Sequence, residues 1–92
     1  MKDIKHYING QYVGSASGKL FDNVNPANGK VISKVHEAGR DEVDAAVKAA
    51  KAALRGPWGK MTLEERTGIL HKVADGINAR FDEFLEAECL DT

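Results

Sequence analysis

The sequence predicts an α/β fold in which short antiparallel strands come first and amphipathic helices follow. Three observations support this order. Asn9-Gly10 divides two β-prone runs, and this dipeptide supplies the positive φ angles of a tight hairpin turn. A second turn signal, "NPANG", occupies residues 25–29. From Gly39 onward the apolar residues recur with a helical period, and no further strand is indicated.

The strands and helices are expected in two separate halves of the chain. The strands cover about 4–36 and lie near 4–8, 11–14, 20–25 and along "KVISKVHEA". The helices are expected at about 40–55, 63–78 and 81–91. The first helix has one apolar face, which is formed by Val43, Ala46, Val47, Ala50 and Leu54.

The ends of the helices carry their own signals. Gly56-Pro57 ends the first helix. "TLEE" is a capping box in which Thr62 is the N-cap and Glu65 stands three residues later, so the second helix begins near Leu63. The apolar face of the third helix is rotated from that of the second, which predicts a break near 78–81.

Composition limits the classes of protein to which the chain can belong. Its 92 residues are 42% hydrophobic, enough for one small domain. The formal net charge of −1 gives no field that would recruit nucleic acid or an anionic membrane. The N-terminus lacks a signal-peptide core, and a single cysteine cannot form an internal disulfide, so a cytoplasmic protein is expected.

The helices lack an obvious packing partner in this sequence. The few strands before them make only a narrow sheet, and the chain ends at "ECLDT" without a Gly or Pro after the last helical turn. We therefore expect the 92 residues to be part of a longer protein.

The stretch "GSASGKL" at residues 14–20 resembles a phosphate-binding loop but departs from its pattern. Three residues separate Gly14 from Gly18 where four are needed, and Leu20 stands where a Ser or Thr would bind Mg²⁺. A phosphate loop also opens a helix, whereas this one leads into an extended run that Pro26 ends. A plain hairpin connection is expected instead.

No other residue type forms a recognisable active site. Cys89 has acidic neighbours, which disfavour a thiolate, and it lies on an apolar helix face, so it is interpreted as a core cysteine. Trp58 stands between two glycines in an interhelical segment and is expected to fill the core. The three histidines, His6, His36 and His71, lack metal-type spacing, and the acids Asp82, Glu83 and Glu86 are interpreted as a solvated helix face.

Several longer stretches resemble the N-terminal part of the NAD-dependent aldehyde dehydrogenase family. They are "YINGQYVGSASGKLFDNVNPANGKVISKV", "VDAAVKAAKAAL", "PWGKM", "ER" and "ECLDT". The resemblance covers the whole chain and implies that residues 1–92 are a partial N-terminal segment of the family's NAD-binding domain. It also implies that the helices pack on a parallel sheet built by later residues.

The resemblance places the chemistry outside this chain. The family's nucleophilic cysteine, general-base glutamate, oxyanion-binding asparagine and dinucleotide-binding turn belong to later segments, and Cys89 does not match the nucleophile's motif. The whole enzyme would use NAD to oxidise an aldehyde. Within the family, the sequence most resembles members whose substrate is a semialdehyde of aromatic-compound catabolism. Its expected partners are that small aldehyde and further copies of itself, without nucleic acid or membrane. The fragment alone is expected to be inactive.

One site of the family maps onto this chain, a monovalent-cation site found in some members. The matching positions are Asn23 and Val24, through main-chain oxygen, and Asp91, through its carboxylate. The ion would be K⁺ or Na⁺, with a further ligand from beyond Thr92. A solvated acid at the end of a helix explains Asp91 equally well.

For the chain as a whole, the alternative to an enzyme fragment is a free-standing interaction module without catalysis.

Overall fold

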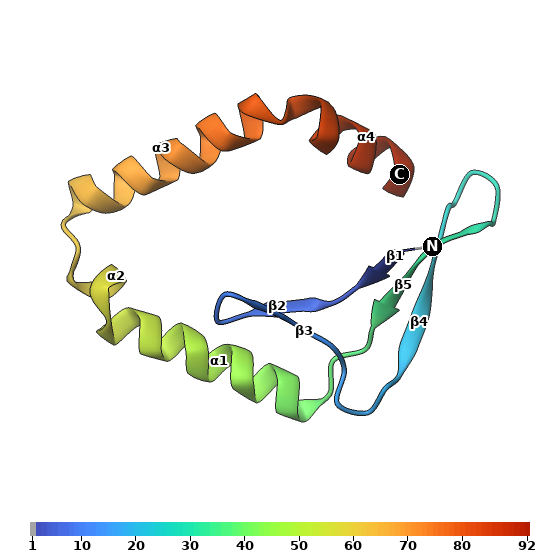
Figure 1. Ribbon diagram of the computed structural model, residues 1–92, viewed down its shortest axis with the longest axis horizontal. Coiled ribbons are helices and arrows are strands. Elements are labelled where there is room, and N and C mark those ends of the chain that lie inside the picture. The colour runs from blue at the N-terminus through green and yellow to red at the C-terminus, as the bar shows by residue number, and fades with distance from the viewer. Residues whose placement is uncertain (1) are drawn as a thin grey trace. The chain divides into compact units, whose positions relative to one another are not determined.

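The computed structural model describes residues 2–92, and Met1, the first residue of the expected segment 1–92, lies outside the described residues. The chain divides into two compact units, residues 1–52 and 53–92, and the division falls in the last turn of the first long helix (Figure 1).

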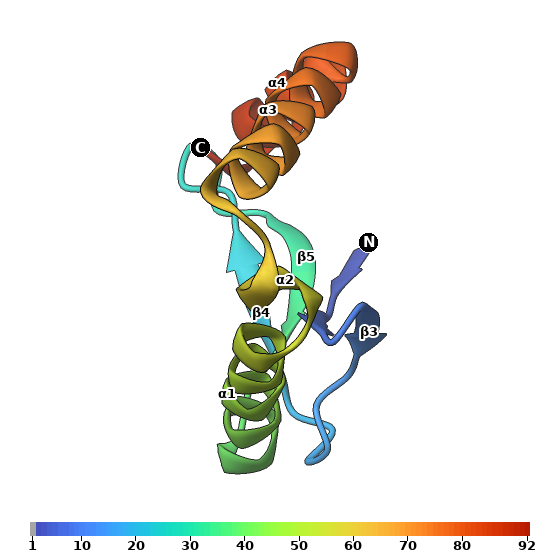
Figure 2. The ribbon, with the colours of Figure 1, turned by 90° about the vertical axis from the view of Figure 1, so that its left-hand side faces the viewer.

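The first unit contains two small sheets and most of helix α1. Its strands are β1 (Lys2–Ile4), β2 (His6–Ile8), β3 (Gln11–Val13), β4 (Leu20–Val24) and β5 (Val31–His36). Within residues 2–92, β1, β5 and β4 form a three-stranded sheet in that order, and β2 pairs with β3 in a separate antiparallel hairpin. β4 and β5 lie side by side in Figures 1 and 2. Short strands followed by helices confirm the predicted fold class, although β1 pairs with β5 in parallel and not antiparallel as expected.

The prediction of one strand over 4–8 is wrong. The chain forms β1 up to Ile4 and β2 from His6, and the two strands belong to different sheets. β1 pairs in parallel with β5, so that Asp3 lies opposite Lys34, whereas β2 pairs with β3. The switch occurs because the pairing partner changes at Lys5, a long-range effect that local strand propensity does not encode.

The hairpin turn at Asn9-Gly10 is confirmed. Asn9 has a φ angle of 52° and Gly10 one of 76°, the left-handed values that the two-residue turn requires. The turn sets the register in which Tyr7 lies opposite Tyr12, and their ring centroids are 5.0 Å apart. This pair stabilises a ribbon that is only three residues long on each side.

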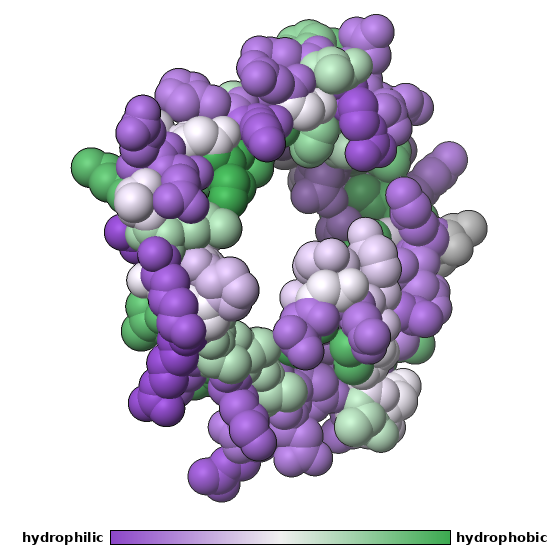
Figure 3. All heavy atoms as spheres, turned by 60° about the vertical axis from the view of Figure 1, so that its left-hand side comes forward, coloured by the Kyte–Doolittle hydropathy of each residue, from purple (hydrophilic) through white to green (hydrophobic). Residues whose placement is uncertain are grey.

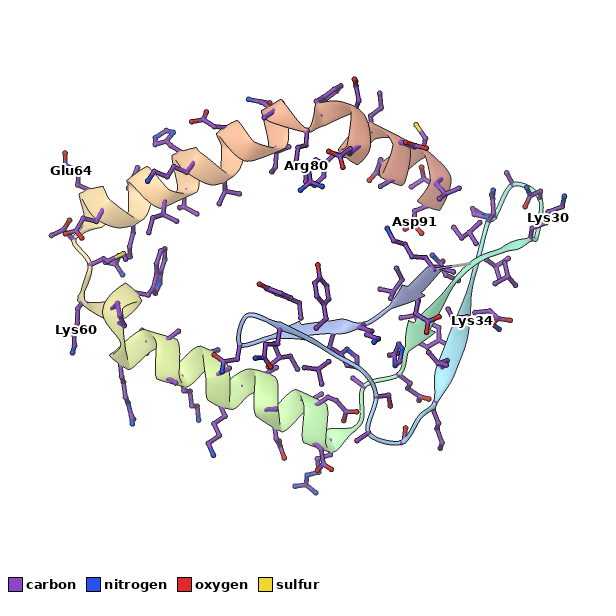
Figure 4. The ribbon with its side chains drawn as sticks, in the orientation of Figure 1. Lys30, Lys34, Lys60, Glu64, Arg80 and Asp91 are labelled. Atoms are coloured by element: carbon purple, nitrogen blue, oxygen red, sulfur yellow. The ribbon has the colours of Figure 1, made fainter. Side chains whose placement is uncertain are left out.

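The second predicted turn connects β4 to β5. The amide of Asn25 donates to the carbonyl of Lys30 (2.8 Å) and that of Gly29 donates to the carbonyl of Asn25 (2.8 Å). The side-chain oxygen of Asn25 also accepts from the amide of Ala27 (2.9 Å), as an Asx turn does. The ion pair of Lys34 with Asp22 links the two strands across the ladder (Figure 4).

The helices follow in the order α1 (Arg40–Arg55), α2 (Pro57–Lys60), α3 (Leu63–Ala79) and α4 (Phe81–Asp91). The single turn α2 occupies a segment for which the sequence indicated only a loop. The predicted cap of α3 is confirmed, because the Thr62 hydroxyl accepts from the amide of Glu65 (3.1 Å).

The predicted break between the last two helices falls at Arg80, whose φ and ψ of −118° and 29° are not helical. Arg80 lies at the junction in Figure 4, and its guanidinium forms a bidentate pair with Glu83, with Nε–Oε2 at 2.7 Å and Nη2–Oε1 at 2.9 Å. This bond lowers the pKa of Glu83 and raises that of Arg80. The pair fixes the first turn of α4 to the residue at which the chain bends.

Apolar side chains gather at the surface rather than in a core. Among the described residues the buried ones are polar, Ser33 (6% exposed) and Glu42 (7% exposed). Figure 3 shows green apolar side chains exposed among polar ones. The interpretations of Trp58 and Cys89 as core residues are therefore wrong for this chain, because Trp58 is 37% exposed and Cys89 is exposed.

Gly59 in α2 lies close to the backbone at the end of α1. A Cβ atom at this position would lie 1.6 Å from the carbonyl oxygen of Leu54 at the end of α1. Backbone is the obstacle, so no side-chain rotation can relieve the clash. Gly68 in α3, by contrast, has no atom within 4 Å of its ideal Cβ position.

Gly59→Ala is expected to lower the free energy of unfolding by about 1 to 3 kcal/mol, because the chain must shift to admit the methyl group. Gly68→Ala is the matched control and should raise it by about 0.5 to 1 kcal/mol, since alanine is the better helix former. Urea denaturation followed by circular dichroism measures both. Equal effects of the two substitutions would contradict the close approach.

Candidate functional site

The most constrained polar site of the first unit surrounds Glu42 in the first turns of α1. One carboxylate oxygen, Oε1, accepts from the amide of Ala16 (2.6 Å), and Oε2 accepts from the amide of Gly39 (3.2 Å). The bond to Gly39 caps the start of α1, whereas the bond to Ala16 spans 26 residues of sequence. Glu42 thus fixes to α1 the turn at residues 14–17, in the connection between β3 and β4; we call it the 14–17 turn.

The hydrogen bonds of Glu42 favour its ionised form. The amide of Ala16 contributes most to lowering the pKa of Glu42 from its ordinary value of 4.5, followed by its own amide and that of Gly39. A positive charge on His6 acts in the same direction, and burial opposes these effects. The net result is a buried carboxylate that stays charged because three amides point at it.

A second side chain holds the same turn from the sheet. Nδ1 of His36, at the end of β5, accepts from the amide of Ser15 (3.0 Å). A Cβ atom on Gly14 would lie 3.2 Å from Cε1 of His36, so a glycine lets the imidazole ring lie close to the chain. Two consecutive amides, those of Ser15 and Ala16, are therefore bound by side chains of β5 and α1.

This arrangement explains why the "GSASGKL" stretch does not cradle phosphate. Besides Ser15 and Ala16, the amide of Gly18 donates to the carbonyl of Ser15 (3.1 Å) and that of Lys19 to the hydroxyl of Ser17 (3.3 Å). The donors that would bind phosphate already have acceptors within the chain. The prediction of a hairpin connection is nevertheless wrong, because β3 and β4, which the turn joins, belong to different sheets.

The proposed cation ligands occupy different units. Asn23 and Val24 lie at the end of β4, where the register against β5 shifts. The side-chain amide of Asn23 donates to the hydroxyl of Ser33 (3.2 Å) across the ladder. Asp91 is the last residue of α4, as Figure 4 shows. The structure describes each ligand within its own unit, and the cation site stays a prediction.

The histidines occupy separate positions on the elements that carry them. His6 lies on β2, His36 on β5 and His71 on α3. Among residues 2–92, no group of three His, Cys, Asp or Glu side chains is arranged to hold a metal ion. In the same range, no helix is long and apolar enough to cross a membrane.

Sequence reasoning missed Glu42. The signal was present, because Gly39 precedes α1 and an acid at the third helical position can bond back to the amide of the N-cap residue. The second bond, to Ala16, had no local signal. It depends on the two sheets bringing the 14–17 turn to the start of α1.

Comparison with known proteins gives the site its family context. The model of the aldehyde dehydrogenase family matches residues 12–92. The chain therefore belongs to the aldehyde dehydrogenase family, which confirms the resemblance seen in the sequence. It is 76% identical over all 92 residues to the 2-hydroxymuconic semialdehyde dehydrogenase of Pseudomonas sp. (strain CF600) and 44% identical to a 2-aminomuconic 6-semialdehyde dehydrogenase of Pseudomonas sp..

The fold is shared with a solved structure of the family. The NAD⁺ complex of an aldehyde dehydrogenase from Bacillus cereus is 43% identical and superposes with a TM-score of 0.89 over 97% of this chain. The chain spans 18 to 19% of the length of these relatives. It thus corresponds to a small part of each.

We expect Glu42→Gln to lower stability at pH 7, because the neutral amide cannot replace an ionised carboxylate that binds several amides. The folded pKa of Glu42 is lowered, so its contribution is present above about pH 4.5 and is lost as the pH falls through the lowered value. The gap between wild type and variant should therefore shrink on acidification. Urea titrations at several pH values measure it.

The matched control for this prediction is Glu86→Gln, which removes an exposed acid of α4. It should change stability by less than about 0.5 kcal/mol at every pH. A gap between wild type and the Glu42 variant that stayed constant from pH 7 to pH 3 would show that the carboxylate charge is not what holds the turn.

Proposed function

We propose that the full-length protein is an NAD-dependent dehydrogenase that oxidises 2-hydroxymuconic semialdehyde to the corresponding carboxylate in aromatic-compound catabolism. The observation that carries this proposal is the 76% identity, over every residue of the chain, to a 2-hydroxymuconic semialdehyde dehydrogenase. A second 2-hydroxymuconic semialdehyde dehydrogenase, from Pseudomonas putida, is 77% identical over 87 residues. The 92 residues are the N-terminal part of the cofactor domain.

The contribution of these residues is structural. The amides of the glycine-rich turn before β4 are bound within the chain, which supports the proposal that this turn does not bind the dinucleotide. NAD, when bound to the full-length enzyme, would accept the hydride. The nucleophile and the general base would come from later segments, as the family resemblance implies. The isolated chain is accordingly proposed to be inactive.

The alternative of a free-standing interaction module is less well supported. The high identity to dehydrogenases runs through the strands and the helices alike. The described residues also bury no large apolar side chain, which a module that folds alone would need.

Two further features of the full-length enzyme belong to the proposal. The cytoplasm is its proposed compartment, because the single cysteine of this chain suits a reducing environment. Its assembly from identical copies is an expectation from the family resemblance.

The function is tested by steady-state kinetics of the full-length protein with three substrates and NAD. They are 2-hydroxymuconic semialdehyde, 2-aminomuconic 6-semialdehyde and a simple aliphatic aldehyde. We expect kcat/KM for the first to exceed the others by at least about tenfold, since polar groups shaped for one substrate reject analogues that leave them unpaired. Equal values for all three would refute the assignment of the substrate, and no NAD reduction with any would refute the enzyme.

Cys89→Ala in the full-length enzyme should leave kcat within about threefold of wild type, because acidic neighbours in the sequence disfavour the thiolate form of Cys89. Pre-steady-state reduction of NAD measures the chemical step. A folded variant that lost several orders of magnitude in that step would identify Cys89 as the nucleophile.

We also propose that Asn23, Val24 and Asp91 hold K⁺ or Na⁺ in the full-length enzyme. Asn23 and Val24 lie where the register of the ladder shifts, and carbonyl and carboxylate oxygens suit a hard cation. K⁺ or Na⁺ should then raise stability over a bulky organic cation at equal ionic strength. The gain is about 1.4 kcal/mol with the ion at about ten times its Kd.

Asp91→Ala should abolish this ion-specific gain, whereas Asp82→Ala on the same helix is the control and should retain it. Thermal unfolding in the different salts measures the effect. Identical melting temperatures of the wild type in all of them would return Asp91 to the role of a solvated acid.

A further inference from the structure

The imidazole ring of His36 lies between a hydrogen-bond donor, the amide of Ser15, and a carboxylate, that of Asp3. On one side, its Nδ1 accepts from the amide of Ser15 (3.0 Å). On the other, its Nε2 is 3.7 Å from Oδ2 of Asp3 on β1, the strand that pairs with β5. The imidazole is 13% exposed, so water reaches little of it.

The bond to Ser15 determines where the ring carries its proton. An amide can donate only to a nitrogen that has no hydrogen, so Nδ1 is bare and the neutral ring carries its hydrogen on Nε2. Nε2 is buried and has no hydrogen-bond partner among the described residues. A buried N–H without an acceptor is costly, and the nearest carboxylate stands just beyond hydrogen-bonding distance.

We propose that His36 is a pH-sensitive clasp for the 14–17 turn: the neutral ring holds the amide of Ser15, and the protonated ring releases it and pairs with Asp3. Protonation places a hydrogen on Nδ1, which then repels the amide it had bound. The same step turns the contact between Nε2 and Asp3 into a charge-assisted hydrogen bond, which needs an approach of about 1 Å.

Glu42 keeps the other end of the 14–17 turn attached when His36 releases Ser15. Its carboxylate holds Ala16, the residue after Ser15, and the amides around it lower its pKa, so that it remains charged while histidines gain protons. Acidification therefore detaches one end of the turn and leaves the other attached. Gly14, against which the ring rests, is the point at which the released chain can move.

Other charged groups lie near His36 and Asp3. Lys34, which lies opposite Asp3 in the β1–β5 ladder, forms an ion pair with Asp22 of β4. His6 on β2 acts on Glu42, and its Nε2 is also buried without a hydrogen bond. Glu37 and Lys19 flank the clasp and are joined through their backbones (2.9 Å). Leu20 of β4, which lies opposite His36 in the ladder, is uncharged.

Amide hydrogen exchange in the full-length protein, resolved to single residues, tests the clasp between pH 8 and pH 5. Protection factors, corrected for intrinsic exchange, should fall about tenfold at Ser15, the fold-change expected on losing one buried hydrogen bond. Those at Ala16 should stay constant. Gly29, whose amide binds the carbonyl of Asn25, is the control for general unfolding.

Two variants test the roles of Asp3 and His36 separately. Asp3→Asn removes the carboxylate that attracts the charged ring, so the loss of protection at Ser15 should move to lower pH. His36→Asn keeps an acceptor near the position of Nδ1 but does not titrate, and it should make the Ser15 protection independent of pH. Three results would overturn the proposal: constant protection at Ser15 in the wild type, a parallel loss at Gly29, or an unchanged profile in His36→Asn.

Discussion

The carboxylate of Glu42 is the interaction on which the first unit depends. It caps α1 through Gly39 and binds the turn that joins the two sheets through Ala16, so three parts of the chain meet at one buried charge. A polar anchor matters more here than in a protein with a large core, because no large apolar side chain among residues 2–92 is buried. The β4–β5 ladder and the parallel β1–β5 pair supply the remaining connections.

The local features of this fold could be predicted because short stretches of sequence specify them. The φ angles of Asn9-Gly10, the Asx turn at Asn25 and the cap at Thr62 each depend on residues within about five positions. Most of the failures involve distant partners, although the short helix α2 is a local feature that was also missed. The split of the first strand at Lys5 follows from pairing with β5. Burial of Cys89 was inferred from an apolar helix face and burial of Trp58 from its place between two glycines, and both side chains are exposed in this chain.

The same distinction separates what could be predicted of the candidate site from what could not. The spacing of its glycines was enough to argue against phosphate binding in the 14–17 turn. The stronger reason, that Glu42 and His36 occupy the amides of Ala16 and Ser15, depends on contacts between residues more than twenty positions apart. The family, in contrast, could be recognised early, because the "NPANGKVI" turn is a local feature.

The helices carry exposed apolar side chains, most clearly on α3. Leu70, Val73 and Ile77 lie on one stripe of α3 and are all exposed, although such a stripe is the usual packing face of a helix. Relatives with which the chain shares 76 to 77% identity are about five times longer, so their later residues can supply the covering surface. The turns, caps and polar anchors of this segment thus fix its local shape, while the apolar stripe of α3 stays exposed among the described residues.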